Sequence, residues 1–186
     1  MPPKAKITKE AIIAAAISLV RKDGADAINA RTVAAILECS TQPIFSNFAT
    51  MEELRLAVVG EANKLCENYI QREVEGGMFP AYKASGIAYI RFAKEEKELF
   101  KLLYMRDRSN ESIPESDELE DKMESLVQHN IGLNLTEAKL FHLEMWAFVH
   151  GIATMLVTGF VDLDFALISR MLTDVYQGMR MRYTVE

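Results

Sequence analysis

Apolar residues recur at intervals of three or four along most of this chain, which is the spacing of one face of an α-helix. Alternation of apolar and polar residues with a period of two, the pattern of a half-exposed strand, is nearly absent. The first segment begins after Thr8, which suits a helix N-cap, and ends at Gly24. Its buried face should consist of Ile12, Ala15, Ala16, Leu19 and Val20. The pattern predicts an all-α protein of about nine helices.

Two short apolar segments, separated by a polar turn at Glu38, follow the first helix. Asn29 suits the cap of the first segment, and Ser40 suits the cap of a short helix over residues 41–47. Pro43 falls in the first turn of that helix, where its missing N–H leaves no bond unmade. The arrangement predicts a helix-turn-helix that reads DNA, although a plain helical corner with solvated polar residues has the same spacing.

The first residues of the short helix carry side chains that suit the reading of bases in a major groove. Gln42 can bond adenine at two positions, and Thr41 can offer a methyl to thymine or a hydroxyl to a phosphate. The starts of the neighbouring helices can attract phosphates. Flexible contacts to the DNA backbone are expected from Lys4, Lys6 and Lys9. The predicted DNA-binding residues are Asn29, Arg31, Thr32, Ser40, Thr41, Gln42, Pro43, Phe45, Asn47 and Thr50.

A capping box from Thr50 to Glu53 predicts that a long helix begins near Met51 and continues to about Glu75. Further helical patterns cover residues 80–95, 98–105, 117–131, 136–158 and 164–182, and residues 106–116 form a polar loop. The chain has no internal repeat and no flexible linker. We therefore expect a DNA-binding domain over residues 1–50 and a larger helical domain over residues 51–186.

Composition narrows the class of protein only modestly. Hydrophobic residues make up 49% of the 186 residues, which is enough for a sizeable core. The net charge is −6, but residues 1–55 carry +1 and the remainder −7, a weak polarity that suits a nucleic-acid-binding head. Neither the two cysteines nor the three histidines have metal-ligand spacing, and no phosphate-binding loop or nucleophile motif occurs. No enzyme activity, cofactor or metal is expected.

Residues 8–54 resemble the N-terminal DNA-binding domain of the TetR family of bacterial transcriptional regulators. The matching segments are residues 11–16, Gly24, 31–34, 39–41, 44–48 and 51–54. Trp146 with His150 and Gly151 also resembles a motif of one branch of the family. The resemblance implies a homodimer on a palindromic operator, which a small-molecule effector releases. Because the chain has no signal-peptide core and no apolar run near 18 residues, we expect a cytoplasmic, nucleoid-associated protein without a membrane partner.

Two further sets of residues follow from the resemblance. TetR-like proteins pair through two C-terminal helices, and these helices carry apolar stripes here, although burial inside one subunit is the alternative. The predicted dimer interface is Leu143, Ala147, His150, Gly151, Thr154, Ile168, Leu172, Val175 and Tyr176. The family's effector site lies among the helices of the body, and the alternative is that the same residues form ordinary core. The predicted pocket residues are Tyr69, Tyr82, Tyr89, Phe92, Phe100, Leu103, Tyr104, Phe141, Met145 and Trp146.

The sequence leaves open the operator, the regulated genes, the identity or existence of an effector, and activation instead of repression. A different class also fits: a helical protein-interaction or small-molecule-binding module without sequence-specific DNA binding.

Four departures from the family pattern bear on DNA binding. Glu38 replaces the usual glycine, so the turn must form without a residue that freely adopts the left-handed conformation. Phe45 replaces a tyrosine and Met51 a lysine, which removes two expected phosphate contacts, and Asn47 replaces a frequent histidine.

We therefore predict modest affinity for DNA with a large share from base contacts and a shallow dependence on salt. Proteins with six to ten phosphate contacts lose about 10³–10⁵ in affinity between 50 and 200 mM salt. A smaller loss is expected here, measured by titration of a bound operator with salt. A loss within that range would contradict the prediction.

Overall fold

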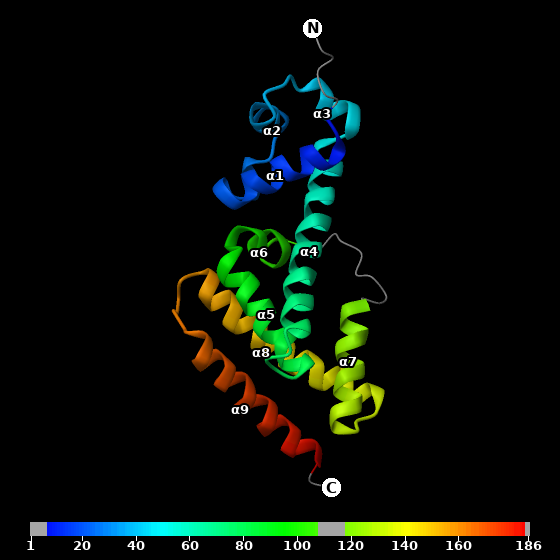
Figure 1. Ribbon diagram of the computed structural model, residues 1–186, viewed down its shortest axis with the longest axis vertical. Coiled ribbons are helices and arrows are strands. Elements are labelled where there is room, and N and C mark those ends of the chain that lie inside the picture. Colours follow the sequence, from blue (N-terminus) through cyan, green and yellow to red (C-terminus); the bar gives the residue numbers. More distant parts are fainter. Residues whose placement is uncertain (1–6, 108–117, 185–186) are drawn as a thin grey trace. The chain divides into compact units, whose positions relative to one another are not determined.

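The computed structural model describes residues 7–107 and 118–184, and in these ranges all regular structure is helical (Figure 1). The helices of the described ranges are α1 (Lys9–Asp23), the short 3₁₀ helix η1 (Ala25–Ala27), α2 (Ala30–Ile36), α3 (Gln42–Asn47), α4 (Met51–Glu75), α5 (Ala81–Glu95), α6 (Lys97–Tyr104), α7 (Glu118–Ile131), α8 (Leu135–Val157) and α9 (Phe165–Thr184). The predicted all-α class of about nine α-helices is confirmed for this part of the chain.

The helices form two compact units. The first contains the described residues up to Cys66 together with Glu96–Arg106, and the second contains Glu67–Glu95 and the described residues from Asp107 onward. The predicted domain boundary after residue 50 falls inside the first unit, because the beginning of α4 and the whole of α6 belong to it. Helix α4 contributes residues to both units.

Local capping fixes the start of the first unit as the sequence predicts. The Thr8 hydroxyl accepts a hydrogen bond from the Ala11 N–H at 3.2 Å, and α1 ends at Gly24, whose φ is +82°. The predicted stripe from Ile12 to Val20 is buried. Helix α6 packs on α1, and the Arg21 guanidinium donates two hydrogen bonds to the Glu96 carboxylate, at 2.8 and 2.7 Å. A two-point pair of this kind holds the beginning of α6 in a defined place on α1.

In the second unit, α5 and α8 lie side by side, with α7 and α9 packed around them (Figure 1). Gly86 of α5 faces both neighbouring helices, since a Cβ atom there would lie 3.4 Å from Val149 of α8 and 3.5 Å from Leu172 of α9, which is ordinary van der Waals contact. The core of this unit includes Ile90, Phe92, Phe141, Ile152 and Ile168, none more than 1% exposed.

The turn between α2 and α3 is built on an unusual residue. The N–H of Glu38 donates to the Ala35 carbonyl and the N–H of Cys39 to the Ala34 carbonyl, which is the double hydrogen bond of a Schellman helix end. This end requires a left-handed residue, and Glu38 takes that conformation with a φ of +50°. In this chain, glutamate therefore takes the left-handed conformation at the position where the family usually has glycine.

Glu38→Gly is expected to raise the free energy of unfolding by about 0.5–1 kcal/mol. Relief of a left-handed side chain is worth about 1–2 kcal/mol, and the greater freedom of glycine in the unfolded chain offsets about 0.4–1 kcal/mol of it. Urea unfolding measures the difference. Glu67→Gly, at an exposed position within α4, should instead lower stability by about 1 kcal/mol. A loss of similar size at both positions would show that the left-handed turn carries no strain.

Candidate functional site

The N-terminus of α2 is capped by the side chains of its own first residues. The Asn29 carboxamide oxygen accepts from the N–H groups of Arg31 (3.0 Å) and Thr32 (3.1 Å), and the Thr32 hydroxyl accepts from the Asn29 N–H at 3.1 Å. The Thr32 hydroxyl also donates to the Ala27 carbonyl at 2.6 Å. The predicted cap at Asn29 is confirmed. Asn29 and Thr32 therefore hold the helix in place, while the Arg31 side chain is exposed to solvent.

Helix α3 begins one residue later than the sequence suggested. Its N-cap is Thr41 and not Ser40, and the Thr41 hydroxyl makes no capping bond. The predicted cap at Ser40 is wrong because the first carbonyl to accept from the helix is that of Thr41, which accepts from the N–H groups of Ile44 at 3.1 Å and Phe45 at 3.3 Å. Pro43 lies in the first turn, as predicted.

Two buried side chains determine which face of α3 turns outward. Ile44 is fully buried and Phe48 is 2% exposed, so both pack in the core of the first unit. The opposite face presents Gln42, Phe45 and Ser46 to solvent, and Phe45 is 51% exposed. The sequence reading omitted Ser46, although its spacing of four from Gln42 would have placed it on this face.

The Asn47 side chain makes hydrogen bonds within the first unit. Its side-chain amide donates to the Pro43 carbonyl at 2.8 Å and to the Ile7 carbonyl at 3.3 Å, and the residue is half-buried. These bonds use both amide hydrogens and tie the chain before α1 to α3. Asn47 therefore positions the outward face, and its own contact with DNA stays a prediction.

The start of α4 is closed by a network around Glu53. The Thr50 hydroxyl accepts from the Glu53 N–H at 3.1 Å, and the Glu53 carboxylate accepts from the Ala49 N–H at 2.7 Å. The backbone hydrogen bond from Ala49 lowers the pKa of Glu53. Lys9 pairs with Glu53 at 3.4 Å and lies over the Phe48 ring at 5.0 Å. Of the lysines expected to contact the DNA backbone, Lys9 is thus engaged within the head, and Lys4 and Lys6 lie outside the described residues.

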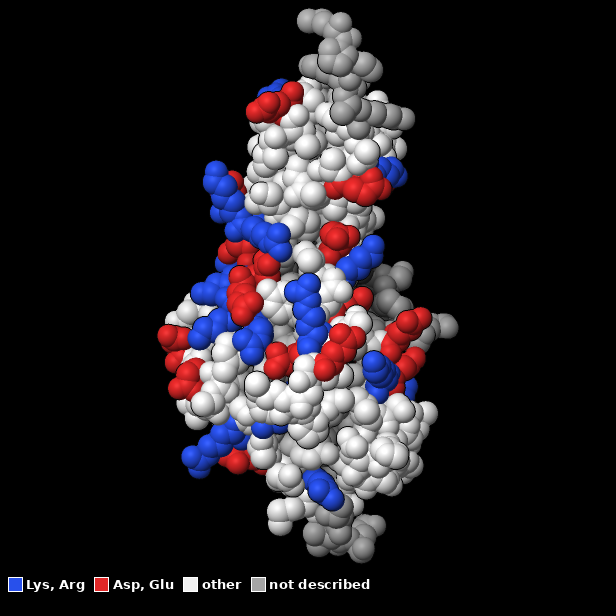
Figure 2. Space-filling model, viewed as in Figure 1, with Lys and Arg blue, Asp and Glu red and all other residues white. Residues whose placement is uncertain are grey.

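Charge is sparse around the outward face of α3. The helix itself contains no charged residue. On the side of the molecule drawn in Figure 2, few charged side chains lie over α1–α3, at the top of the view. Any recognition by this face must depend on hydrogen bonding and apolar contact more than on charge.

In the second unit, α8 exposes an apolar face. Leu143 is 59% exposed and Trp146 is 40% exposed, and Ala147 also reaches solvent. The Trp146 ring stacks on His150, with ring centroids 4.8 Å apart and an interplanar angle of 16°. Three of the predicted interface residues, His150, Gly151 and Thr154, are half-buried beside this face.

The predicted interface on α9 requires correction. Ile168 is fully buried and Leu172 is 3% exposed, so they pack within the unit, as the alternative of burial inside one subunit described. Val175 and Tyr176 are half-buried and pack against the cluster around Phe141. The exposed apolar residues of α9 lie one position earlier in the helical repeat, at Leu167 and Met181, with Gly178 between them.

The structure divides the predicted pocket residues between the two units. Phe100, Leu103 and Tyr104 belong to the first unit, where the Phe100 and Tyr104 rings lie 4.9 Å apart. In the second unit, Tyr69 packs on Phe92 with ring centroids 5.4 Å apart. The remaining predicted residues of that unit are Tyr82, Tyr89, Phe141, Met145 and Trp146. Phe92, Phe100, Leu103, Phe141 and Met145 are each at most 5% exposed, which fits the alternative of ordinary core packing.

Two tyrosine–histidine pairs join α5 to α8. The Tyr82 hydroxyl lies 3.0 Å from His142 Nδ1, and the Tyr89 hydroxyl lies 2.9 Å from His150 Nδ1. Burial raises the pKa of the Tyr82 phenol and lowers the pKa of His142 and of His150. Both shifts favour the neutral side chains, so the pairs satisfy hydrogen bonds without burying charge.

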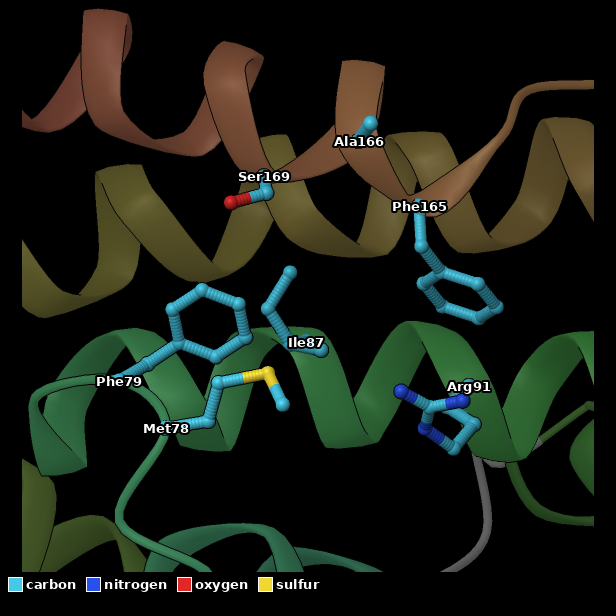
Figure 3. Close-up of a pocket in the computed structure, with 7 residues that line it drawn as sticks. All are labelled: Met78, Phe79, Ile87, Arg91, Phe165, Ala166 and Ser169. Carbon is cyan, nitrogen blue, oxygen red and sulfur yellow. The ribbon is translucent and has the colours of Figure 1, made fainter.

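A hollow of about 240 Å³ lies in the second unit (Figure 3). It is lined by Met78, Phe79, Ile87, Arg91, Phe165, Ala166 and Ser169.

Helix α8 is long and apolar enough to cross a membrane by length and composition alone. The core helix of a soluble protein can have the same length and apolar composition, and α8 contributes eight buried residues to the core of its unit.

Comparisons with known proteins agree with this architecture. Residues 82–175, just over half of the chain, match the family model for the tetracyclin repressor-like C-terminal domain. A solved protein of unknown function from Rhodococcus sp. RHA1 is 21% identical, with a TM-score of 0.73 over 97% of both chains. A TetR-like transcriptional regulator from the same organism is 13% identical, with a TM-score of 0.64 over 98% of this chain and 97% of that one. No curated protein matches the sequence.

Proposed function

Because this chain belongs to the TetR family of transcriptional regulators, we propose that it is a homodimeric repressor that binds a palindromic DNA operator. A small, largely apolar effector releases it, and the protein acts in the bacterial cytoplasm, on the nucleoid. The observation that carries the proposal is the outward face of α3, where Gln42, Phe45 and Ser46 are exposed together.

This face has the chemistry of a base-reading surface. A major groove admits one α-helix, and residues near its N-terminus contact the base edges. Gln42 is the first residue of α3 and can bond N6 and N7 of adenine. The exposed Phe45 ring can contact a thymine methyl, and this contact would bury apolar surface that is exposed to water in the free protein. Arg31, exposed at the start of α2, is the natural partner of a phosphate.

The exposed face of α8 supports the proposal that two subunits pair. An isologous interface brings the same patch of each subunit together, and Leu143, Trp146 and Ala147 form such an apolar patch. Leu167 and Met181 of α9 are further exposed apolar residues of this unit. A dimer with two-fold symmetry would place two α3 helices on half-sites about 34–36 Å apart.

A second candidate is a helical protein-interaction or small-molecule-binding module without sequence-specific DNA binding. The absence of charge on α3 and the pairing of Lys9 with Glu53 favour it, because both reduce attraction to phosphates. Selection of binding sites from a random palindromic library at low salt separates the two candidates. Recovery of no preferred sequence would sink the repressor proposal.

Gln42→Ala is expected to weaken operator binding by about 1–3 kcal/mol and to relax the preference at one base position. Loss of a two-point contact to adenine causes both effects. Gel-shift titration against the selected operator and its single-base variants measures them. Gln71→Ala, an exposed glutamine in the second-unit part of α4, serves as the control and should leave binding unchanged. Equal affinity of Gln42→Ala and wild type would remove Gln42 from the reading surface.

Leu143→Glu is expected to convert the dimer to a monomer, because it buries a carboxylate at the centre of the paired faces. Sedimentation at micromolar concentration measures the change, and affinity for the palindrome should fall with it. Leu56→Glu is the matched control, since Leu56 is also 59% exposed but lies on α4 in the first unit. A Leu143→Glu protein that stays dimeric would exclude this face as the interface.

A further inference from the structure

The hollow of the second unit combines apolar walls with one charged side chain. It lies between the residues that precede α5, the middle of α5 and the beginning of α9 (Figure 3). Phe79 and Met78 stand at one end, and Phe165 covers Arg91 at the other. Of the seven lining residues, only Arg91 is charged, and Ser169 is the other residue with a polar side chain.

The Arg91 guanidinium has donor capacity that its neighbours do not fill. Its Nε lies 3.4 Å from the Glu73 carboxylate and its Nη1 lies 3.8 Å from the Glu95 carboxylate. Both distances exceed the roughly 2.7–2.9 Å of a charge-assisted hydrogen bond. The Nε atom is buried and makes no hydrogen bond. The guanidinium carbon lies 4.3 Å from the centre of the Phe165 ring, which holds the planar group in a fixed orientation.

We propose that this hollow binds a small amphipathic monocarboxylate, with its carboxylate on Arg91 and its apolar part between Phe79 and Phe165. A guanidinium fork matches the two oxygens of a carboxylate. Lys83, whose Nζ lies 4.8 Å from the centre of the Phe79 ring, adds positive charge near one end, and Lys94, 5.8 Å from the centre of the Phe165 ring, is paired with Asp162 at 3.1 Å. A cationic ligand would face repulsion from the lining arginine.

The volume limits the size of the ligand. Pockets for drug-sized ligands span about 300–1,000 Å³, and the hollow measures about 240 Å³. A single aromatic ring with a carboxylate therefore fits, whereas a long acyl chain does not. Met78 is 77% exposed at the rim, and its flexible side chain can close over a bound ring.

The site also suggests how binding acts on α4, a step that rests on the proposed function. Glu73 belongs to the last turns of α4, which begins at Met51. A ligand carboxylate competes with Glu73 for Arg91 and so loosens the pair that ties the end of α4 to α5. This assigns the proposed effector to the class of small aromatic acids.

Calorimetric titration of the full chain with sodium benzoate tests the site, and benzamide serves as the neutral analogue. Wild type should bind benzoate at least tenfold more tightly than benzamide, and Arg91→Gln should lose at least tenfold in benzoate affinity. Ala166→Trp, a change at an exposed lining residue, should block binding by filling the hollow. Glu73→Gln should raise benzoate affinity severalfold because it removes the competing carboxylate. Thermal melts establish that each variant is folded.

Two variants control for general changes in charge. Arg170→Gln and Glu67→Gln alter exposed residues of α9 and α4 that do not line the hollow, and each should leave benzoate affinity unchanged. Absence of benzoate binding at millimolar concentration would overturn the site. Equal affinity of benzoate for folded Arg91→Gln or Ala166→Trp would overturn it as well.

A gel shift with the selected operator then separates the site from its regulatory role. Benzoate should weaken DNA binding by wild type and not by Arg91→Gln. Binding of benzoate through Arg91 without any effect on operator affinity would overturn the role of the ligand as effector and leave the site intact. If no operator can be selected, the repressor proposal fails. Calorimetry with benzoate still tests the carboxylate site by itself.

Discussion

The packing of Ile44 and Phe48 is the interaction on which the head depends. Helix α3 has only six residues, far fewer than the roughly 12–15 at which an isolated helix becomes marginally stable in water. It therefore exists because these two side chains are buried, and their burial dictates which residues face outward. The bonds of Asn47 to Pro43 and Ile7, and of Glu53 to Ala49, then hold the C-terminal end of α3 and the start of α4. A surface for recognition is thus set by residues that do not themselves belong to it.

The second unit meets a different constraint, which is to pack a largely apolar α5 closely against two helices. The phenol hydroxyls of Tyr82 and Tyr89, which lie in this packing, find partners in two histidines of α8. Each pair removes a hydroxyl and an imidazole from water without leaving either unsatisfied. The histidines of α8 are accordingly part of the packing.

Local signals in the sequence located most helix boundaries, because capping is a property of a few neighbouring residues. Thr8, Asn29 and Thr50 illustrate this, and each accepts the hydrogen bond that its position suggested. The face of α9 could not be decided in this way, since Leu167 and Ile168 begin two apolar stripes one residue apart. Only packing against α5 and α8 selects Ile168 for burial. The position of the hollow beside Arg91 could not be predicted from the sequence either, because a cavity is the space that three separate segments leave between them.

Trp146 is the single tryptophan of the chain, and it lies half in solvent with its ring stacked on His150. The intrinsic fluorescence of this protein therefore originates mainly from one surface of α8. Coverage of that surface by any partner would transfer the indole from water to an apolar environment and shift its emission to shorter wavelength. The molecule thus carries its own optical probe, and the occupancy of this surface can be followed in solution without a label.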